Sequence, residues 1–221
     1  RSSDLGTVND LAVSGAKPLY ITSAFIIEEG FSIKKLEQIV MSMANEARKS
    51  GVKIVAGDTK VVERGNVDGI FINTSGIGRI YENVNINCAN AREGDIVIVN
   101  GTLGDHGMTI MCARNKLGLV GDLRSDCACL NSLVDTMLEA YGGIHVIRDA
   151  TRGGIAAVLN EISEFSNVTI AIEENNLPVK EEVKGVTEML GLDPLYIANE
   201  GKLCAFVPES QIGRASCRER V

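Results

Sequence analysis

The 221-residue sequence has no tryptophan, only two histidines and four prolines, and just 4% aromatic residues. Hydrophobic residues nevertheless make up 45% of it. A chain of this composition builds its core from aliphatic side chains and is typical of an α/β or α+β globular protein. No apolar run approaches the roughly 20 residues that a membrane-spanning helix needs, so we expect no membrane association.

Basic residues are also scarce, 22 against 29 acidic ones, and the formal net charge is −7. An acidic chain is by default a poor ligand for nucleic acids and anionic membranes, so we expect neither as a partner. The six cysteines include no CxxC pair, and Cys127 and Cys129 are too close together for a standard zinc knuckle. We find no signal peptide, and therefore expect reduced thiols and a cytoplasmic protein.

The two ends of the chain do not read like the rest. Residues 1–5 and 211–221 look like translated sequencing-library adapter, so we expect them to be non-native and residues 6–210 to be a piece of a longer reading frame. Leaving the ends out removes four arginines and two acidic residues and moves the net charge from −7 to −9. A native basic tail is the alternative, but it would not explain both ends at once.

Helical and strand periods alternate along the chain. The spacing of apolar residues predicts helices over 31–50, 108–112, 130–141, 155–165 and 183–190, and strands over 52–56, 70–74, 96–99, 145–147, 169–172 and 202–207. A polar stretch followed by a turn predicts a boundary within residues 82–93. We therefore expect one unit over residues 6–85 and a second, mixed α+β unit over residues 86–210.

Two aspartates, Asp10 and Asp58, are predicted to lie in glycine-bounded turns beside apolar segments, where a carboxylate is costly unless a cation or hydrogen-bond donor receives it. Lys60 follows Asp58 by two residues and lies on the same face if the strand continues. This pattern indicates a Mg²⁺ and phosphate site. From the pattern alone, an Asx-turn at Asp58 and a helix cap at Asp10 are equally good explanations.

A glycine-rich turn over residues 101–107 separates the strand 96–99 from the next helix. Such a turn can hold an anion on free backbone N–H groups, but this one fits neither the Walker A nor the dinucleotide-binding pattern. His106, within this turn, is either a catalytic group or the donor of a hydrogen bond at the helix start. Asp149 and Arg152 suggest an ion pair that orders their loop, with phosphate binding by Arg152 as the alternative.

Four segments together resemble the hydrogenase maturation factor HypE family. They are Gly6-Thr7-Val8-Asn9-Asp10-Leu11-Ala12-Val13-Ser14-Gly15-Ala16-Lys17-Pro18-Leu19-Tyr20, Gly57-Asp58-Thr59-Lys60-Val61-Val62-Glu63-Arg64-Gly65, Asp149-Ala150-Thr151-Arg152-Gly153-Gly154 and Asn199-Glu200-Gly201-Lys202-Leu203. The Asn-Asp-Leu-Ala and Gly-Asp-Thr elements alone mark only the wider PurM-like superfamily of ATP-using enzymes. The resemblance covers nearly all of residues 6–210.

The resemblance implies a specific reaction. HypE proteins carry a C-terminal cysteine that receives a carbamoyl group from HypF, and they use ATP and Mg²⁺ to dehydrate the resulting thiocarboxamide to a thiocyanate. The thiocyanate supplies cyanide ligands for [NiFe]-hydrogenase through the HypC–HypD complex. Because an amide oxygen leaves poorly, its phosphorylation by ATP creates a good leaving group, and a base then removes the N–H protons.

The resemblance also implies roles for single residues. Asp10 and Asp58 would hold the Mg²⁺ that bridges the ATP phosphates, and Asn9, Gly57 and Thr59 would complete the cofactor site. Lys60 and Glu200 would be the catalytic pair near the modified cysteine, with Glu200 as the base, kept ionised by the lysine. Without the resemblance, Lys60 reads as a surface lysine and Glu200 as a turn residue.

For the fold, the resemblance implies two PurM-like α+β domains, with the N-terminal domain forming half of a β-barrel in a homodimer. Against the family pattern, both domains look truncated, with an exposed sheet edge and without the acceptor cysteine, so we expect the fragment to be inactive. Two alternatives remain. One is another PurM-like enzyme, of the selenophosphate synthetase or thiamine-monophosphate kinase type; the other is a nucleotide-binding dimeric docking module.

Overall fold

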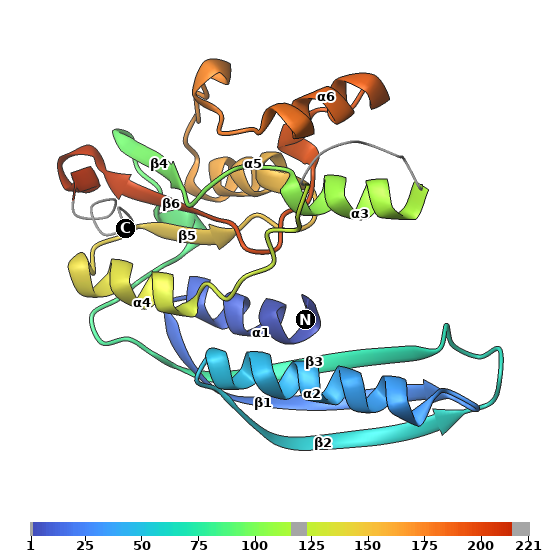
Figure 1. Ribbon diagram of the computed structural model, residues 1–221. Helices are drawn as coiled ribbons and strands as arrows, with labels where there is room; N and C mark the ends of the chain where they lie inside the picture. Colours follow the sequence, from blue (N-terminus) through green and yellow to red (C-terminus); the bar gives the residue numbers. More distant parts are fainter. Residues whose placement is uncertain (1, 116–122, 214–221) are drawn as a thin grey trace.

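The computed structural model describes residues 2–115 and 123–213 and contains two sheets with helices packed on them (Figure 1). The helices are α1 (Ser2–Val13), α2 (Ile33–Lys49), α3 (Asp105–Asn115), α4 (Asn131–Ala140), α5 (Gly154–Ser166) and α6 (Glu181–Leu190). The strands are β1 (Ala16–Glu28), β2 (Lys53–Val62), β3 (Ile70–Ile80), β4 (Asp95–Val99), β5 (Val146–Asp149) and β6 (Leu203–Pro208). The chain is therefore mixed α+β.

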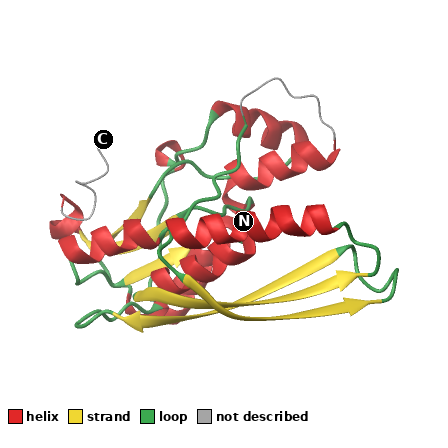
Figure 2. Cartoon of the chain, turned by 60° about the horizontal axis from the view of Figure 1, so that its bottom comes forward, coloured by secondary structure: helices red, strands yellow, loops and turns green. Residues whose placement is uncertain are grey.

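The first sheet, sheet A, has the order β2-β1-β3, with β2 parallel and β3 antiparallel to the central β1. Helices α1 and α2 both lie on one face of it (Figure 1), where Val8, Ile21, Ala47 and Val52 form a small core. No described helix covers the opposite face, which comes forward in Figure 2. That face exposes 40–65% of the side chains of Tyr20, Ile26, Phe71 and Ile77.

The second sheet, sheet B, is antiparallel with the order β4-β6-β5. Alternate residues of the central strand β6 enter two cores, since side chains of a strand point to opposite faces in turn. Leu203, Ala205 and Val207 pack with α1 and α4, while Cys204 and Phe206 pack with α5. Burial on both faces raises the pKa of the Cys204 thiol to about 12, so this thiol stays protonated.

Helix α1 connects the two sheets. Thr7 on one side of the helix donates or accepts a hydrogen bond with Thr74 of β3, at 2.7 Å between the hydroxyl oxygens. Ala12 and Val13 on the other side enter the core beneath sheet B. Leu5, within the segment that we expect to be foreign, is buried as well. The position of sheet A relative to sheet B thus depends on this helix.

Most predicted elements are present, but three expectations are wrong. Asp58 is not in a turn, because β2 continues past Gly57 as far as Val62 through its pairing with β1. Asp10 is likewise inside α1 and neither in a turn nor capping a helix. Residues 169–172 form no strand and belong to neither sheet, since no described strand offers them backbone partners. Strand β1 was not predicted from the sequence.

Strand β2 forms one outer edge of sheet A among the described strands, as expected, and nine of its ten residues are exposed.

None of the described helices is both long enough and apolar enough to cross a membrane.

Replacement of Gly154 by alanine tests the packing at the start of α5. Gly154 has φ +64°, and a Cβ there would collide with the carbonyl oxygen of Leu195 and lie 2.8 Å from that of Ile197. We expect Gly154→Ala to lower the free energy of unfolding by at least about 2 kcal/mol. Gly185→Ala in α6 is the matched control, because a Cβ there meets nothing within 4 Å, and it should stabilise the chain by about 0.5–1 kcal/mol. Urea unfolding measures both, and equal effects would contradict the packing described.

Candidate functional site

The backbone around Glu200 is fixed from several directions. The side chain of Asn199 accepts a hydrogen bond from the N–H of Gly104 at 2.8 Å and donates to the carbonyl of Ala150 at 3.0 Å. The N–H of Glu200 donates to Asp126 at 3.1 Å. These contacts bring the start of α3, the end of β5 and the start of β6 to one place.

Asn9 of α1 ties this turn to the N-terminal helix. Its Nδ2 donates to the carbonyls of Ala128 and Glu200 at 3.0 and 3.3 Å, and its Oδ1 accepts from the N–H of Leu130 at 2.8 Å. The side chain is only 2% exposed. The amide of Asn9 is thus occupied by backbone groups, and Asn9 serves in this structure as a connection between chain segments.

A small polar cluster surrounds the Glu200 side chain. His106, the second residue of α3, has its Nε2 3.8 Å from a carboxylate oxygen of Glu200. Its Nδ1 lies 2.8 Å from the hydroxyl of Ser125 and 3.7 Å from the sulfur of Cys127. The Ser125 hydroxyl is in turn 3.1 Å from that sulfur. No sequence motif predicted this cluster, and the role of His106 was left open.

Acidic groups crowd this region. Burial raises the pKa of Glu200, His106 opposes the shift, and the carboxylates of Asp126, Asp149 and Asp10 add to it. An acid with a raised pKa can exchange protons closer to neutral pH, as a general base or acid must. Lys202 compensates one of the charges, with its Nζ 3.3 Å from Asp126.

Asp10 faces a cavity of about 410 Å³ between α1 and β5. Arg148 and Asp149 of β5 and Cys88 also line it. Asp10 is an exposed residue, yet the cavity walls remove water from its carboxylate, and this desolvation raises its pKa. The negative charge of Asp149 raises the pKa further, whereas the positive charge of Arg148 lowers it. Asp10 therefore lies in a partly enclosed polar space beside a guanidinium.

The other predicted residues lie on β2. Asp58 and Lys60 pair with Ala24 and Ile26 of β1, so both point from the face of sheet A that no described helix covers. Thr59 points to the other face, although its N–H donates to the Asp58 carboxylate at 2.9 Å. Gly57 permits close packing on β1, since a Cβ there would lie 2.6 Å from the carbonyl oxygen of Ser23.

Within one chain, the predicted site is thus divided into two groups. Asn9, Asp10 and Glu200 lie together between α1 and sheet B, whereas Asp58 and Lys60 point from the bare face of sheet A. Lys60 does not lie beside Glu200. The side chain that faces the Glu200 carboxylate, and that is positively charged when protonated, is His106. Among the described residues, no group of three or more His, Cys, Asp or Glu side chains could hold a metal ion.

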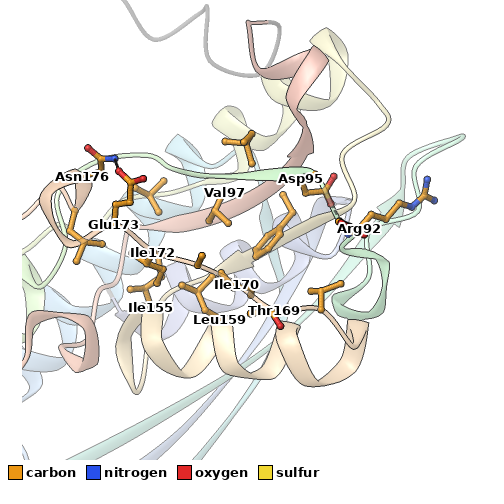
Figure 3. A pocket seen from close by; sticks show the side chains of 18 of the residues that line it. Arg92, Asp95, Val97, Ile155, Leu159, Thr169, Ile170, Ile172, Glu173 and Asn176 are labelled. Carbon is orange, nitrogen blue, oxygen red and sulfur yellow. Dashed lines mark hydrogen bonds between the residues drawn. The ribbon is translucent and has the colours of Figure 1, made fainter.

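A larger cavity of about 830 Å³ lies between β4, α5 and residues 167–178 (Figure 3). Its walls include Val97, Ile155, Leu159 and Ile170, with Arg92 and Asp95 at one end. None of the predicted site residues lines it. The region around Asp10 and Glu200 therefore remains the candidate site.

Comparison with known proteins identifies the family of the chain. The family model described as AIR synthase related protein, C-terminal domain, matches residues 92–215, and the corresponding N-terminal domain model matches residues 5–80. Carbamoyl dehydratase HypE of Rhodobacter capsulatus is 52% identical over 210 residues, which are 95% of this chain and 62% of the relative. The Escherichia coli K12 protein of the same name is 51% identical over 91% of this chain and 60% of its own length.

Solved structures agree with the sequence relatives. A chain in the crystal structure of a HypE–HypF complex has a TM-score of 0.94 and 54% identity, covering 96% of this chain and 70% of that one. HypE solved in complex with ATP has a TM-score of 0.93 and 46% identity, with 96% of this chain and 64% of that one covered. The chain belongs to the HypE family of AIR synthase related proteins. It spans about 60% of the length of the curated HypE relatives that it matches.

A thiamine monophosphate kinase from Aquifex aeolicus also matches, with a TM-score of 0.75 but only 20% identity over 93% of this chain and 70% of that one. This likeness shows the shared PurM-like fold alone. The two family models begin at residue 5 and end at residue 215, so they reach into both end segments that we expect to be foreign. The origin of those segments stays a prediction.

Removal of the Asn9 side chain tests the connection between α1 and the Glu200 turn. Asn9→Ala leaves one buried N–H and two carbonyls without their partner, so we expect the free energy of unfolding to fall by about 2–3 kcal/mol. Asn160→Ala is the matched control, because the exposed Asn160 makes one bond, to the carbonyl of Ala156 in its own helix; it should change stability by less than about 0.5 kcal/mol. Denaturant unfolding of both variants decides the matter, and similar losses would contradict the role of Asn9.

Neutralisation of Glu200 tests the electrostatics of the cluster. A carboxyl whose pKa is raised by folding favours the folded state below its unfolded pKa and loses that contribution as pH rises through the folded value. Glu200→Gln should therefore be more stable than the unchanged chain at pH 7.5, and this advantage should disappear near pH 4, about the ordinary pKa of glutamate. Unfolding curves at both pH values measure it; a variant less stable at pH 7.5 would contradict the raised pKa.

Proposed function

We propose that the longer protein corresponding to this chain is an ATP-dependent carbamoyl dehydratase that converts a C-terminal cysteine S-carboxamide to a thiocyanate for [NiFe]-hydrogenase maturation. The observation that supports it best is the position of Glu200, held by the backbone contacts of its turn among other acidic groups with a raised pKa. The relatives named carbamoyl dehydratase HypE, about 50% identical, support this class of reaction.

In this proposal Glu200 takes a proton from the amide nitrogen. ATP phosphorylates the amide oxygen, the C–O bond breaks with phosphate as the leaving group, and loss of the N–H protons leaves the C≡N bond on sulfur. A carboxylate that is partly desolvated is a stronger base than one in water. The surroundings of Glu200 therefore suit it to this step.

Asp10 is the residue that we propose for Mg²⁺ in this half of the site. Mg²⁺ usually takes only one or two protein carboxylates and fills its other positions with phosphate oxygens and water. The exposed carboxylate of Asp10, in the wall of a cavity that Asp149 also lines, fits that requirement. When bound, the ion would neutralise charge on the transferred phosphoryl group, and Arg148 lies close enough to contribute to the same balance.

We propose that Asp58, Lys60, Gly57 and Thr59 join the ATP site through a homodimer. Asp58 and Lys60 point from the bare face of sheet A, which also exposes Tyr20, Ile26, Phe71 and Ile77. An exposed apolar face of this kind is typical of a subunit interface. A second copy packed on that face would supply a surface against which the two polar side chains can act.

The partners follow from the same proposal. The solved HypE–HypF complex supports HypF as the carbamoyl donor, and the HypC–HypD complex would accept the cyano group. Reaction and partners would be cytoplasmic, where thiols such as those of Cys88, Cys112, Cys127, Cys129 and Cys204 stay reduced. No nucleic acid or membrane enters the scheme.

The test uses an extended chain, defined here as residues 6–210 joined to the N- and C-terminal flanks of the Rhodobacter capsulatus relative. Its C-terminal cysteine is carbamoylated with cyanate, and mass spectrometry follows the ATP-dependent loss of one water. We expect Glu200→Gln to slow this loss by about 100-fold or more. Glu164→Gln on the exposed surface of α5 is the matched control and should react normally.

Two results would overturn the proposal. An extended chain that binds ATP and HypF without dehydrating the cysteine would favour the docking module, and phosphorylation of thiamine monophosphate instead would favour a kinase. An unchanged rate in Glu200→Gln would remove Glu200 from the mechanism while leaving the reaction standing.

A further inference from the structure

The contacts around His106 concern how the Glu200 carboxylate is aimed. We propose that His106 is a positioning residue for Glu200, with its own ring oriented by Ser125. This inference rests on the proposed dehydration, and it goes beyond the sequence motifs, which left the role of His106 open and gave none to Ser125. Its basis is the juxtaposition of three side chains from separate parts of the chain.

The imidazole of His106 has a fixed location beside the Glu200 turn. His106 is the second residue of α3, and the N–H of its neighbour Gly107 donates to the carbonyl of Ala198 at 2.9 Å, two residues before Glu200. A Cβ on Gly107 would lie 2.6 Å from Ile197, so only glycine permits this approach. The start of α3 and the Glu200 turn are therefore held side by side, and the imidazole cannot drift away from the carboxylate.

Hydrogen bonding at one ring nitrogen of His106 leaves the other nitrogen facing Glu200. Nδ1 lies 2.8 Å from the hydroxyl of Ser125, which leaves Nε2 facing Glu200 at 3.8 Å. That distance suits an ion pair but exceeds a hydrogen bond, and catalytic contacts of this kind commonly shorten when substrate binds. Both side chains are largely buried, 18% and 22% exposed, so water competes little for the contact.

The other charged groups that act on Glu200 are acidic. Three carboxylates repel an ionised Glu200: those of Asp126 in the loop before α4, Asp149 at the end of β5 and Asp10 on α1. His106 on α3 attracts it. Asp126 is itself paired with Lys202. Of the four groups that act on Glu200, only His106 attracts its carboxylate, and His106 therefore favours the direction in which Glu200 points.

The experiment compares replacements of His106 in the extended chain. His106→Ala should lower kcat about 10- to 100-fold, because a misdirected base loses its alignment with the substrate proton, and should leave the KM for ATP unchanged. His106→Gln keeps an amide that can contact both Ser125 and Glu200, so it should recover most of kcat. Ser125→Ala should fall between the two.

The matched control is His145→Gln, which removes the only other histidine, paired with Asp95 at 2.8 Å at the opposite end of β5. It should leave kcat per folded molecule unchanged. If the extended chain is active and His106→Ala has a normal kcat, the positioning role is overturned while the proposed function stands. A loss of kcat in His106→Ala that His106→Gln does not recover overturns the positioning role as well. If even the unsubstituted extended chain makes no thiocyanate, the proposed function fails first.

Discussion

The three hydrogen bonds of the Asn9 side chain are the constraint on which the arrangement of this chain depends. One buried amide satisfies backbone groups of Ala128, Leu130 and Glu200, and so joins α1 to the loop before α4 and to the turn before β6. The apolar packing of Ala12 and Val13 against the core beneath sheet B has no directional preference, so these hydrogen bonds orient α1. The position of Asp10, next to Asn9 in α1, follows directly from that orientation.

Repulsion among the acidic residues around Glu200 lowers the stability of this arrangement. Asp10, Asp126, Asp149 and Glu200 lie close enough to influence one another, and a protein selected only for stability would not gather them in partly buried space. Cationic partners compensate them incompletely: Lys202 pairs with Asp126, and Arg148 pairs with Glu161 at 3.0 Å while facing Asp10. Residual repulsion of this kind is typical of functional sites, and it would be relieved by a bound divalent cation.

The sequence predicted those parts of the structure that local pattern controls. Helix α2 follows from apolar residues at helical spacing, and β6 from a short aliphatic run. Asp58 was placed in a turn because Gly-Asp is a strong local turn signal, whereas pairing with β1 keeps β2 extended through it. The role of Asn9 was beyond local reasoning, since its partners lie 119, 121 and 191 residues away. For the same reason His106 and Ser125 were not connected with Glu200.

The distribution of the predicted residues over two surfaces sets a condition on any mechanism. Asp10 and Glu200 are oriented by contacts inside the chain, so their geometry is established when the chain folds. Asp58 and Lys60 point from the bare face of sheet A, where solvent screens both charges and no described side chain fixes them. Phosphoryl transfer depends on positioned charge in a site that excludes water. If both groups serve one reaction, the ordering of the second group must come from whatever covers that face, and assembly then becomes part of the catalytic machinery.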